Sequence, residues 1–426
     1  MSRRAVLAYS GGLDTSVAVR WMAEELGTEV VALAVDVGQG GDFEAIRQRA
    51  LAAGAVEAIV VDARREYAED FVAPALRANA VYEGKYPLVS ALSRPVIVRH
   101  LVATARAEGC DAVAHGCTGK GNDQVRFEVS TAALAPELEM LAPVRGWGLT
   151  REESIAYAQR HDIPITVTRA SPYSVDQNLW GRTIECGVLE DPWQSPPEEV
   201  YETTTPTATD ACDLVIGFDE GIPTSLDGRS LALHDLIDEV TRVVGSYGWG
   251  RIDMVENRRV GIKSREIYEC PGSLALLMAH ADLEDLTLER DLAHEKARLE
   301  PRYAELVYDG LWYSPLKQAL DAFVAESQRH VQGEVRLRCE VPGRCIVAGR
   351  RSPVGLYDYD LATYEAADVF RHADAEGFVR LWGLGVKTWS ARQGLGSGTG
   401  EPGPGPAPDP EPGQPGGPAV EPSPIT

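Results

Sequence analysis

The sequence predicts an α/β protein whose N-terminal part is a parallel-sheet domain. Apolar runs typical of buried strands alternate with amphipathic runs typical of helices through the first part of the chain. The segment Ser10–Ser16, rich in glycine and hydroxyl side chains, lies between the first apolar run and the first helical one. Such alternation indicates parallel strands with helices on both faces, and ligands bind beyond the carboxyl ends of those strands.

The elements of this first domain follow one another in a regular order. Asp42 can cap the second helix and Gly54 can close it, while Thr150 and Glu153 match a capping box before the fifth. Strands are expected at 5–9, 30–36, 57–62, 111–116 and 163–167, and helices near 16–26, 42–53, 66–79, 91–108 and 151–160.

From about residue 170 the pattern changes to short strands mixed with helices, which predicts a second, α+β domain. We therefore expect a first domain at 1–169, a second domain at 170–395 and a tail at 396–426. Elements of the second domain are expected at 213–219, 231–244, 272–281, 288–306, 315–328, 334–341 and 344–349.

The last part of the chain carries two further signals. The tail 396–426 holds ten of the 27 prolines and eight of the 41 glycines, so it cannot offset its ordering entropy and should be disordered. Before it, the segment 374–392 reads as an apolar element. It could dock on a neighbouring subunit or on its own domain, and the sequence does not decide between them.

Composition narrows the class of partner. The formal net charge of −23 weighs against a nucleic-acid substrate, because affinity for nucleic acid draws on Lys and Arg that neutralise phosphates. The first residues do not resemble a secretory signal, and no apolar stretch approaches the ~20 residues that span a bilayer. The seven cysteines are odd in number and lack a C-x-x-C pair. We expect reduced thiols in a cytoplasmic protein with small-molecule substrates.

The segment Ser10–Ser16 has the features of a phosphate-binding loop. Free N–H groups at a helix N-terminus and the helix dipole favour an anion, and Ser10, Thr15 and Ser16 add hydroxyl donors. Its spacing fits neither the dinucleotide fingerprint nor the Walker loop. Asp14 would face loop amides or a Mg²⁺ ion brought by the nucleotide. A helix cap without a ligand remains the alternative at this point.

The loop S-G-G-x-D-[ST]-S resembles that of the ATP pyrophosphatases, and a second block, 115–128, resembles the corresponding segment of the argininosuccinate synthases. The resemblance extends from about Val6 to about Gly355. Further matching segments are Tyr86–Leu88, Ser171–Trp180, Gly250–Arg258 and Lys263–Glu269.

This resemblance implies an ATP-dependent, AMP-forming C–N ligase of arginine biosynthesis. Residues 1–169 would be its ATP-binding domain and 170–395 its synthetase domain. The family's homotetramer favours 374–392 as an oligomerisation element that docks on a neighbouring subunit. The ureido oxygen of L-citrulline would attack the α-phosphate of ATP, giving citrullyl-AMP and diphosphate. The amine of L-aspartate would then displace AMP and form argininosuccinate. Mg²⁺ would be carried by ATP, with no protein side chain assigned as its ligand.

The resemblance also assigns residues. Asp14, Ser16 and Asp123 would be catalytic, and Thr118, Asn122 and Asp123 would hold aspartate. The ATP site would comprise Ala8, Tyr9, Ser10, Gly11, Gly12, Leu13, Asp14, Thr15, Ser16, Val35 and Gly116. The citrulline site would comprise Tyr86, Ser90, Asn122, Arg126, Ser174, Thr183, Glu256 and Tyr268.

Taken singly, many of these residues have plainer interpretations, such as a turn pair, a surface salt bridge or a core aromatic. Val35 could simply pack in its strand. For His115 a buried, hydrogen-bonded histidine is favoured over a proton carrier, and for Cys117 a small buried residue over a nucleophile. Two positions depart from the family: Ala91 and Thr183 stand where serine is common, and the adjacent Ser90 offers a replacement hydroxyl.

Two competing functions are weighed against this interpretation. A tRNA-thiolating or glutamine-dependent synthetase would want a C-x-x-C pair, a basic surface or an N-terminal cysteine. A nucleotide-binding sensor would bind ATP without turnover.

Overall fold

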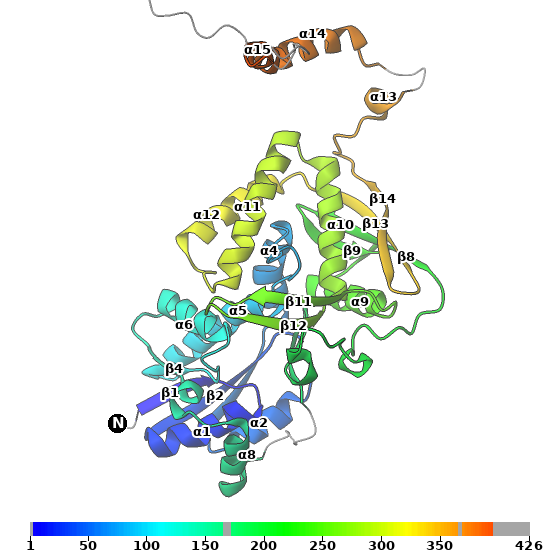
Figure 1. Cartoon of the computed structure of the whole chain (residues 1–426). Helices are drawn as coiled ribbons and strands as arrows, with labels where there is room; N and C mark the ends of the chain where they lie inside the picture. The colour runs from blue at the N-terminus through cyan, green and yellow to red at the C-terminus, as the bar shows by residue number, and fades with distance from the viewer. Residues whose placement is uncertain (1–2, 165–171, 365–368, 395–426) are drawn as a thin grey trace, which may run out of the picture. The chain divides into compact units, whose positions relative to one another are not determined.

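The computed structural model describes residues 3–164, 172–364 and 369–394. The chain divides into two compact units, with the division at Tyr357/Asp358 (Figure 1). The domain boundary predicted at 169/170 and the predicted tail 396–426 lie outside the described residues. Both stay predictions.

A five-stranded parallel sheet forms the N-terminal half of the first unit. Its strand order is β3-β2-β1-β4-β5, so the chain first builds outward from β1 on one side and later returns to add β4 on the other. The gap beyond the carboxyl ends of β1 and β4 is therefore the switch point at which such sheets bind ligands. The strands are β1 (Arg3–Ala8), β2 (Thr28–Asp36), β3 (Glu57–Asp62), β4 (Ala112–Ala114) and β5 (Glu139–Leu141).

Four of the five predicted strands are confirmed, and the described part of the fifth, 163–167, is not a strand. Ile163 and Pro164 have no regular structure, and 165–167 lie outside the described residues. The fifth strand of the sheet is β5, whose three residues are too few to show a strand period. Ile163 is buried beside α1, so its apolar signal came from a packed loop residue.

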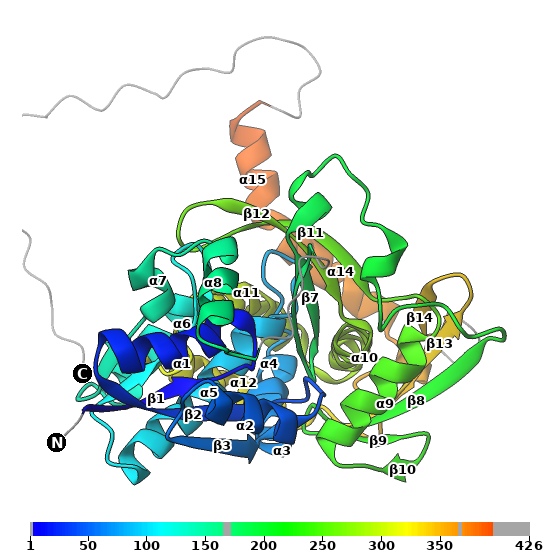
Figure 2. The ribbon, with the colours of Figure 1, turned by 90° about the horizontal axis from the view of Figure 1, so that it is seen from below.

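Helices cover both faces of the sheet because the side chains of β1 alternate (Figure 2). Ala5 and Leu7 pack in one cluster with Val17. Val6 packs in another with Leu92. The helices on the first face are α1 (Leu13–Glu25), α2 (Phe43–Ala52), α7 (Pro143–Trp147) and α8 (Arg151–Arg160), and those on the second include α5 (Val89–Ala107) and α6 (Asp123–Leu134).

The predicted caps are confirmed. Asp42 Oδ1 accepts a hydrogen bond from Ala45 N at 2.9 Å. Thr150 and Glu153 form a reciprocal capping box, in which Thr150 N donates to Glu153 Oε2 at 2.7 Å. The helix predicted at 66–79 is broken up, because Pro74 cannot donate the usual backbone bond. It consists of α3 (Arg64–Glu66), a π-helical turn η1 (Tyr67–Val72) and α4 (Ala73–Arg77).

The second half of the first unit has the predicted mixture of short strands and helices around two antiparallel sheets, ordered β10-β9-β8-β13-β14 and β11-β12-β7-β6. The strands are β6 (Ser174–Asn178), β7 (Gly181–Glu185), β8 (Cys212–Asp219), β9 (Ile222–Leu226), β10 (Arg229–Ser230), β11 (Arg251–Asn257), β12 (Lys263–Glu269), β13 (Gly333–Glu340) and β14 (Arg344–Arg351). The longer helices are α9 (Leu233–Gly245), α10 (Pro271–Thr287), α11 (Arg290–Tyr308) and α12 (Pro315–Ser327). Two short 3-10 turns are η2 (Gly187–Glu190) and η3 (Glu198–Val200).

The second unit contains α13 (Tyr359–Ala362), α14 (His372–Trp382) and α15 (Leu384–Arg392). The apolar side chains predicted in 374–392 are exposed, with Leu381 at 74% and Trp382 at 77%. Neither predicted docking partner is tested by this. Of the helices within the described residues, none is long and apolar enough to cross a membrane.

Candidate active site

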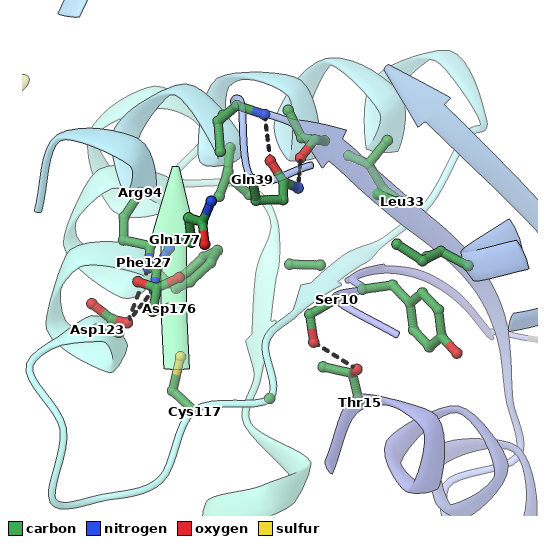
Figure 3. Close-up of a pocket in the computed structure, with 18 of the residues that line it drawn as sticks. Ser10, Thr15, Leu33, Gln39, Arg94, Cys117, Asp123, Phe127, Asp176 and Gln177 are labelled. Carbon is green, nitrogen blue, oxygen red and sulfur yellow. Dashed lines mark hydrogen bonds and ion pairs between the residues drawn. The ribbon is translucent and has the colours of Figure 1, made fainter. Parts of the chain in front are cut away.

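A cavity of about 480 Å³ opens at the predicted switch point of the parallel sheet. Figure 3 shows Ser10 and Thr15 on one side of it and Arg94, Asp123 and Asp176 on the other. It is lined by Ala8, Tyr9, Ser10, Thr15, Leu33, Ala34, Val35, Val37, Gln39, Phe43, Ile46, Arg94, Ile97, Gly116, Cys117, Asp123, Phe127, Val175, Asp176 and Gln177.

The glycine-rich loop turns directly into helix α1. Gly12 is the N-cap residue, and no side chain caps the helix. Gly11 has a φ of +76°, and a Cβ there would lie 3.0 Å from Arg49 Nη2, so this position requires glycine. The first N–H groups of α1 are thus available to an anion at the cavity.

Hydroxyl groups brace the loop internally. Tyr9 Oη and Ser16 Oγ are 2.9 Å apart, and Ser10 Oγ and Thr15 Oγ1 are 3.2 Å apart. Of the expected ATP-site residues in 8–16, four line the cavity, namely Ala8, Tyr9, Ser10 and Thr15. The cavity lining does not include Gly11, Gly12, Leu13, Asp14 and Ser16, and Ser16 is fully buried.

Asp14 is the loop's carboxylate, in the first turn of α1. Burial raises the pKa of Asp14, and the positive charge of Arg151 opposes that rise. No group of three or more His, Cys, Asp or Glu side chains within the described ranges could hold a metal ion.

The loop and the 115–128 block meet in space. A Cβ at Gly116 would lie 2.7 Å from Thr15 Cγ2, so only glycine allows this approach. Val35 also lines the cavity, and its carbonyl accepts a hydrogen bond from Gln39 Nε2 at 2.8 Å. Sequence reasoning missed Gln39, whose Oε1 in turn accepts from Val37 N at 2.7 Å.

Two acids and two arginines form a charged cluster at the cavity wall. Arg94 Nη2 donates to Asp123 Oδ2 at 2.7 Å and to Asp176 Oδ2 at 2.6 Å. Arg126 Nη1 donates to Asp123 Oδ1 at 2.8 Å. Burial alone would raise the pKa of Asp123, but the two arginines lower it to about 2, so this carboxylate is ionised. The resemblance assigns Asp123 and Arg126 to different substrates, but in this structure the two side chains form an ion pair with each other.

Sequence reasoning missed Arg94 and Asp176 as site residues. Arg94 lies in a helix that is otherwise mostly apolar, and its side chain is only 13% exposed. Asp176 lies within the matching segment Ser171–Trp180, which was the available signal for it.

A second hydrogen-bonded network connects Arg126 with tyrosine, asparagine and glutamate side chains. Tyr268 and Tyr308 donate hydrogen bonds to the two oxygens of Glu256, at 2.9 and 3.0 Å. Asn122 Nδ2 donates to Tyr308 Oη at 2.7 Å, and Arg126 Nε donates to the Tyr308 carbonyl at 3.0 Å. Burial raises the pKa of Glu256, and these partners oppose the rise. Tyr308, at the end of α11, was not predicted, because nothing in its local sequence marks it.

The remaining predicted residues divide into two groups. Tyr86 stacks on Tyr268 with centroids 4.5 Å apart, and its hydroxyl accepts from Ser90 N at 2.8 Å. Ser90 Oγ donates to Asp176 Oδ2 at 2.6 Å and lies 3.5 Å from Thr183 Oγ1.

Two predicted residues lie apart from these networks. Ser174 is exposed on β6, opposite Glu185, and Thr118 is exposed in the loop before α6. The structure brings neither side chain into the hydrogen-bonded networks that it describes.

His115 is buried and hydrogen-bonded, as predicted. Its Nδ1 accepts from Cys117 N at 3.2 Å, and Nε2 lies 3.3 Å from Glu128 Oε1. Burial lowers the pKa of His115, with Glu128 opposing that change. Burial also raises the pKa of the Cys117 thiol, which disfavours a thiolate nucleophile there.

A parallel sheet with a glycine-rich loop at its switch point defines a nucleotide-binding enzyme class, and the comparisons agree. Residues 4–164 match the model of the arginosuccinate synthase N-terminal HUP domain, and residues 173–389 match that of the C-terminal domain. An argininosuccinate synthase of Bacillus pumilus (strain SAFR-032) is 57% identical over 389 residues, which are 91% of this chain and 96% of the relative. The chain belongs to the argininosuccinate synthase family.

The family and the ligase class expected from the sequence are thereby confirmed. Two solved structures also resemble parts of the chain. One is a U34-tRNA thiolase NcsA from Methanococcus maripaludis, with a TM-score of 0.26 and 16% identity over 40% of this chain and 61% of that chain. The other is an NAD+ synthetase from Burkholderia pseudomallei, with a TM-score of 0.27 and 19% identity over 39% of this chain and 63% of that chain. These likenesses are too low to bear on function.

Proposed function

We propose that the cavity between the glycine-rich loop and the charged cluster joins L-citrulline to L-aspartate in two steps that use ATP. As a member of the argininosuccinate synthase family, the chain is an AMP-forming C–N ligase of arginine biosynthesis. Its products are argininosuccinate, AMP and diphosphate, with citrullyl-AMP as the intermediate. The observation that carries this proposal is the 57% identity over nearly the whole chain.

ATP is proposed to bind along residues 8–16, with Val35 and Gly116 beside the nucleoside. The amides at the start of α1 would hold the phosphates, and Ser10 and Thr15 would add hydroxyl donors at the cavity wall. Ser16 would act through its bond to Tyr9. Mg²⁺ would arrive with the triphosphate, near Asp14, the carboxylate in the first turn of α1.

Citrulline is proposed to bind against Arg126, Glu256 and the stacked tyrosines. A planar guanidinium suits a carboxylate, so Arg126 would take the citrulline carboxylate in exchange for part of its bond to Asp123. Glu256 would pair the α-ammonium group. The other proposed citrulline contacts are Tyr86, Ser90, Asn122, Ser174, Thr183 and Tyr268.

Aspartate is proposed to bind at Asp123, with Thr118 and Asn122 as further contacts. The ionised Asp123 carboxylate would pair the ammonium group of aspartate before the amine attacks. Neither step needs a side-chain nucleophile, because the phosphate and the ureido carbon are the reacting centres. Alignment of bound reactants can lower a barrier by roughly 7–11 kcal/mol, and one aimed donor adds about 3 kcal/mol.

Four further expectations belong to this proposal. We propose domains at 1–169 and 170–395 with a tail at 396–426, a homotetrameric assembly, a cytoplasmic location and the use of Mg²⁺. The exposed apolar side chains of α14 and α15 support a subunit contact.

Diphosphate release tests the proposal directly. Purified chain is given ATP and Mg²⁺, then citrulline, then aspartate, and diphosphate and AMP are measured at each stage. We expect diphosphate release to depend on citrulline and AMP release to depend on aspartate. Release that ignores citrulline would contradict the proposal, and ATP binding with no release would instead favour a nucleotide sensor.

A further inference from the structure

Three cysteines far from the cavity lie in one row across the second half of the first unit. Strands β8, β13 and β14 are neighbours in their sheet (Figure 1). In the strand register, Cys339 pairs with Cys212 on one side and with Cys345 on the other. Residues directly opposite each other point to the same face of a sheet, so the three thiols share one face. We call Cys212, Cys339 and Cys345 the thiol row.

One pair of sulfurs in the row is already in contact. Cys339 Sγ lies 3.2 Å from Cys345 Sγ, and the Cys212 side chain interacts with the Cys339 thiol. A disulfide bond is about 2.05 Å long, so the first pair needs to close by roughly 1 Å. Cross-strand Cα separations of about 4.5–5.5 Å fall within the range that disulfides span.

The thiols differ in access. Cys339 is fully buried and Cys345 is 6% exposed, whereas Cys212 is half-buried at the start of β8. The other four cysteines are spread over separate places: Cys110 and Cys117 flank β4, Cys186 follows β7 and Cys270 precedes α10. The row is thus a buried pair of touching sulfurs with one more accessible neighbour.

We propose that Cys339 and Cys345 form a reversible disulfide when the chain meets a hydroperoxide, and that Cys212 is the thiol through which oxidation enters. With hydrogen peroxide, the Cys212 sulfur attacks one oxygen, the O–O bond breaks, and sulfenic acid and water result. The Cys339 sulfur then displaces the hydroxyl group as a second water and forms a Cys212–Cys339 disulfide. Cys345 attacks the Cys339 sulfur, and Cys212 leaves as a thiol carrying the proton of Cys345.

In the overall reaction, two thiols lose two electrons and form one disulfide, and one hydrogen peroxide is reduced to two waters. The pKa of the Cys212 thiol is raised by burial, with the Tyr247 hydroxyl opposing the rise. Because the thiolate is the reacting form, oxidation should be slow at neutral pH and quicken as pH rises. The resulting bond would tie the edge strand β14 to β13 without touching the cavity.

Peptide mapping of the full chain tests the proposal. The folded chain is treated with graded hydrogen peroxide, free thiols are alkylated, and trypsin is added. Trypsin cuts after Arg338, Arg344 and Arg350, so residues 339–344 and 345–350 separate unless a disulfide joins them. We expect the joined pair, lighter by two hydrogens than its parts, to be the first oxidised product that accumulates and to disappear with dithiothreitol.

Two variants distinguish the roles within the row. Cys212→Ser should slow formation of the joined pair several-fold, while the matched control Cys186→Ser, also half-buried, should leave its rate unchanged. An unchanged rate in Cys212→Ser would overturn the entry role. Oxidation of Cys110 or Cys186 before any joined pair forms would overturn the site itself, and this measurement on the unaltered chain needs no variant to fold.

Discussion

The glycine-rich loop and the charged cluster face each other across one cavity, yet they are built in opposite ways. Bonds within the loop join near neighbours, such as Ser10 with Thr15 and Tyr9 with Ser16. Bonds around the cluster join residues as far apart as Asn122 and Tyr308, 186 positions along the chain. The loop's geometry is therefore set locally, whereas the cluster exists only once α5, α6, β6 and α11 have packed together.

This difference has an energetic consequence. Loss of one neutral hydrogen bond made by a loop hydroxyl lowers the free energy of unfolding by about 1 kcal/mol. A buried ion pair that loses one partner costs about 3–5 kcal/mol, because the remaining charge stays buried. Substitutions in the charged cluster should thus be the more damaging, and should affect one substrate rather than the nucleotide.

Asp123→Asn should have the largest effect. The substitution removes the charge that Arg94 and Arg126 share, so argininosuccinate formation should fall by at least about 100-fold, near 3 kcal/mol. Citrulline-dependent diphosphate release should remain measurable. Separate assays of the two products check this, with the exposed Asp111→Asn as a control. Equal loss of both steps would place Asp123 outside the aspartate half-reaction.

Arg126→Lys should come next. Lysine cannot reach both Asp123 and the Tyr308 carbonyl with a planar fork. We expect the KM for citrulline to rise about 30-fold while the KM for ATP changes less than threefold. Steady-state kinetics with each substrate varied in turn would show this. A matching rise in the KM for ATP would mean that the cluster and the loop are not separable.

The same contrast explains what the sequence could predict. Strand, loop and helix signals lie side by side in 5–26, so the parallel sheet, its switch point and the loop were predictable. The helix caps predicted at Asp42 and Thr150 are confirmed, because capping also depends on residues that are close in the sequence. Strand β5 was not predicted, because three residues carry no periodicity. The strand predicted at 163–167 began at Ile163, whose apolar side chain packs in a core cluster without being part of a strand.

Within the site, the missed residues are those that tertiary packing recruits. In the sequence, Arg94 is a charged residue in a mostly apolar helix, and Tyr308 is the last residue of α11. Neither local pattern indicates a site residue. Only in the fold do they close the network around Asp123 and Glu256. Gln39 was missed for a different reason, since a side chain that caps its own strand end resembles an ordinary turn.

Gly116→Ala should produce a moderate effect, on the nucleotide side. The added Cβ would meet Thr15 Cγ2 at 2.7 Å, and rotating Thr15 would break its bond to Ser10. We expect the KM for ATP to rise about tenfold, with the KM for citrulline nearly unchanged. The double variant Gly116→Ala/Thr15→Ser removes the clashing methyl group and should recover most of the loss. Failure of that rescue would contradict a steric origin.

His115→Asn should show the smallest effect, and only as a function of pH. Burial lowers the pKa of His115, so the folded chain binds its proton less readily than the unfolded chain, whose histidine titrates near 6.5. The stability that neutral His115 provides is therefore complete above about pH 6.5 and lost as pH falls through the lowered folded pKa. Asparagine can still accept from Cys117 N but does not titrate.

Urea unfolding at several pH values measures this effect on both chains. The stability advantage of the unaltered chain over His115→Asn should shrink as pH falls from 7 to 5. The exposed His294→Asn controls for histidine replacement as such. A difference that stays constant with pH would mean that His115 does not hold the 115–117 turn through its neutral ring. The junction between loop and cluster would then depend on the Gly116–Thr15 contact instead.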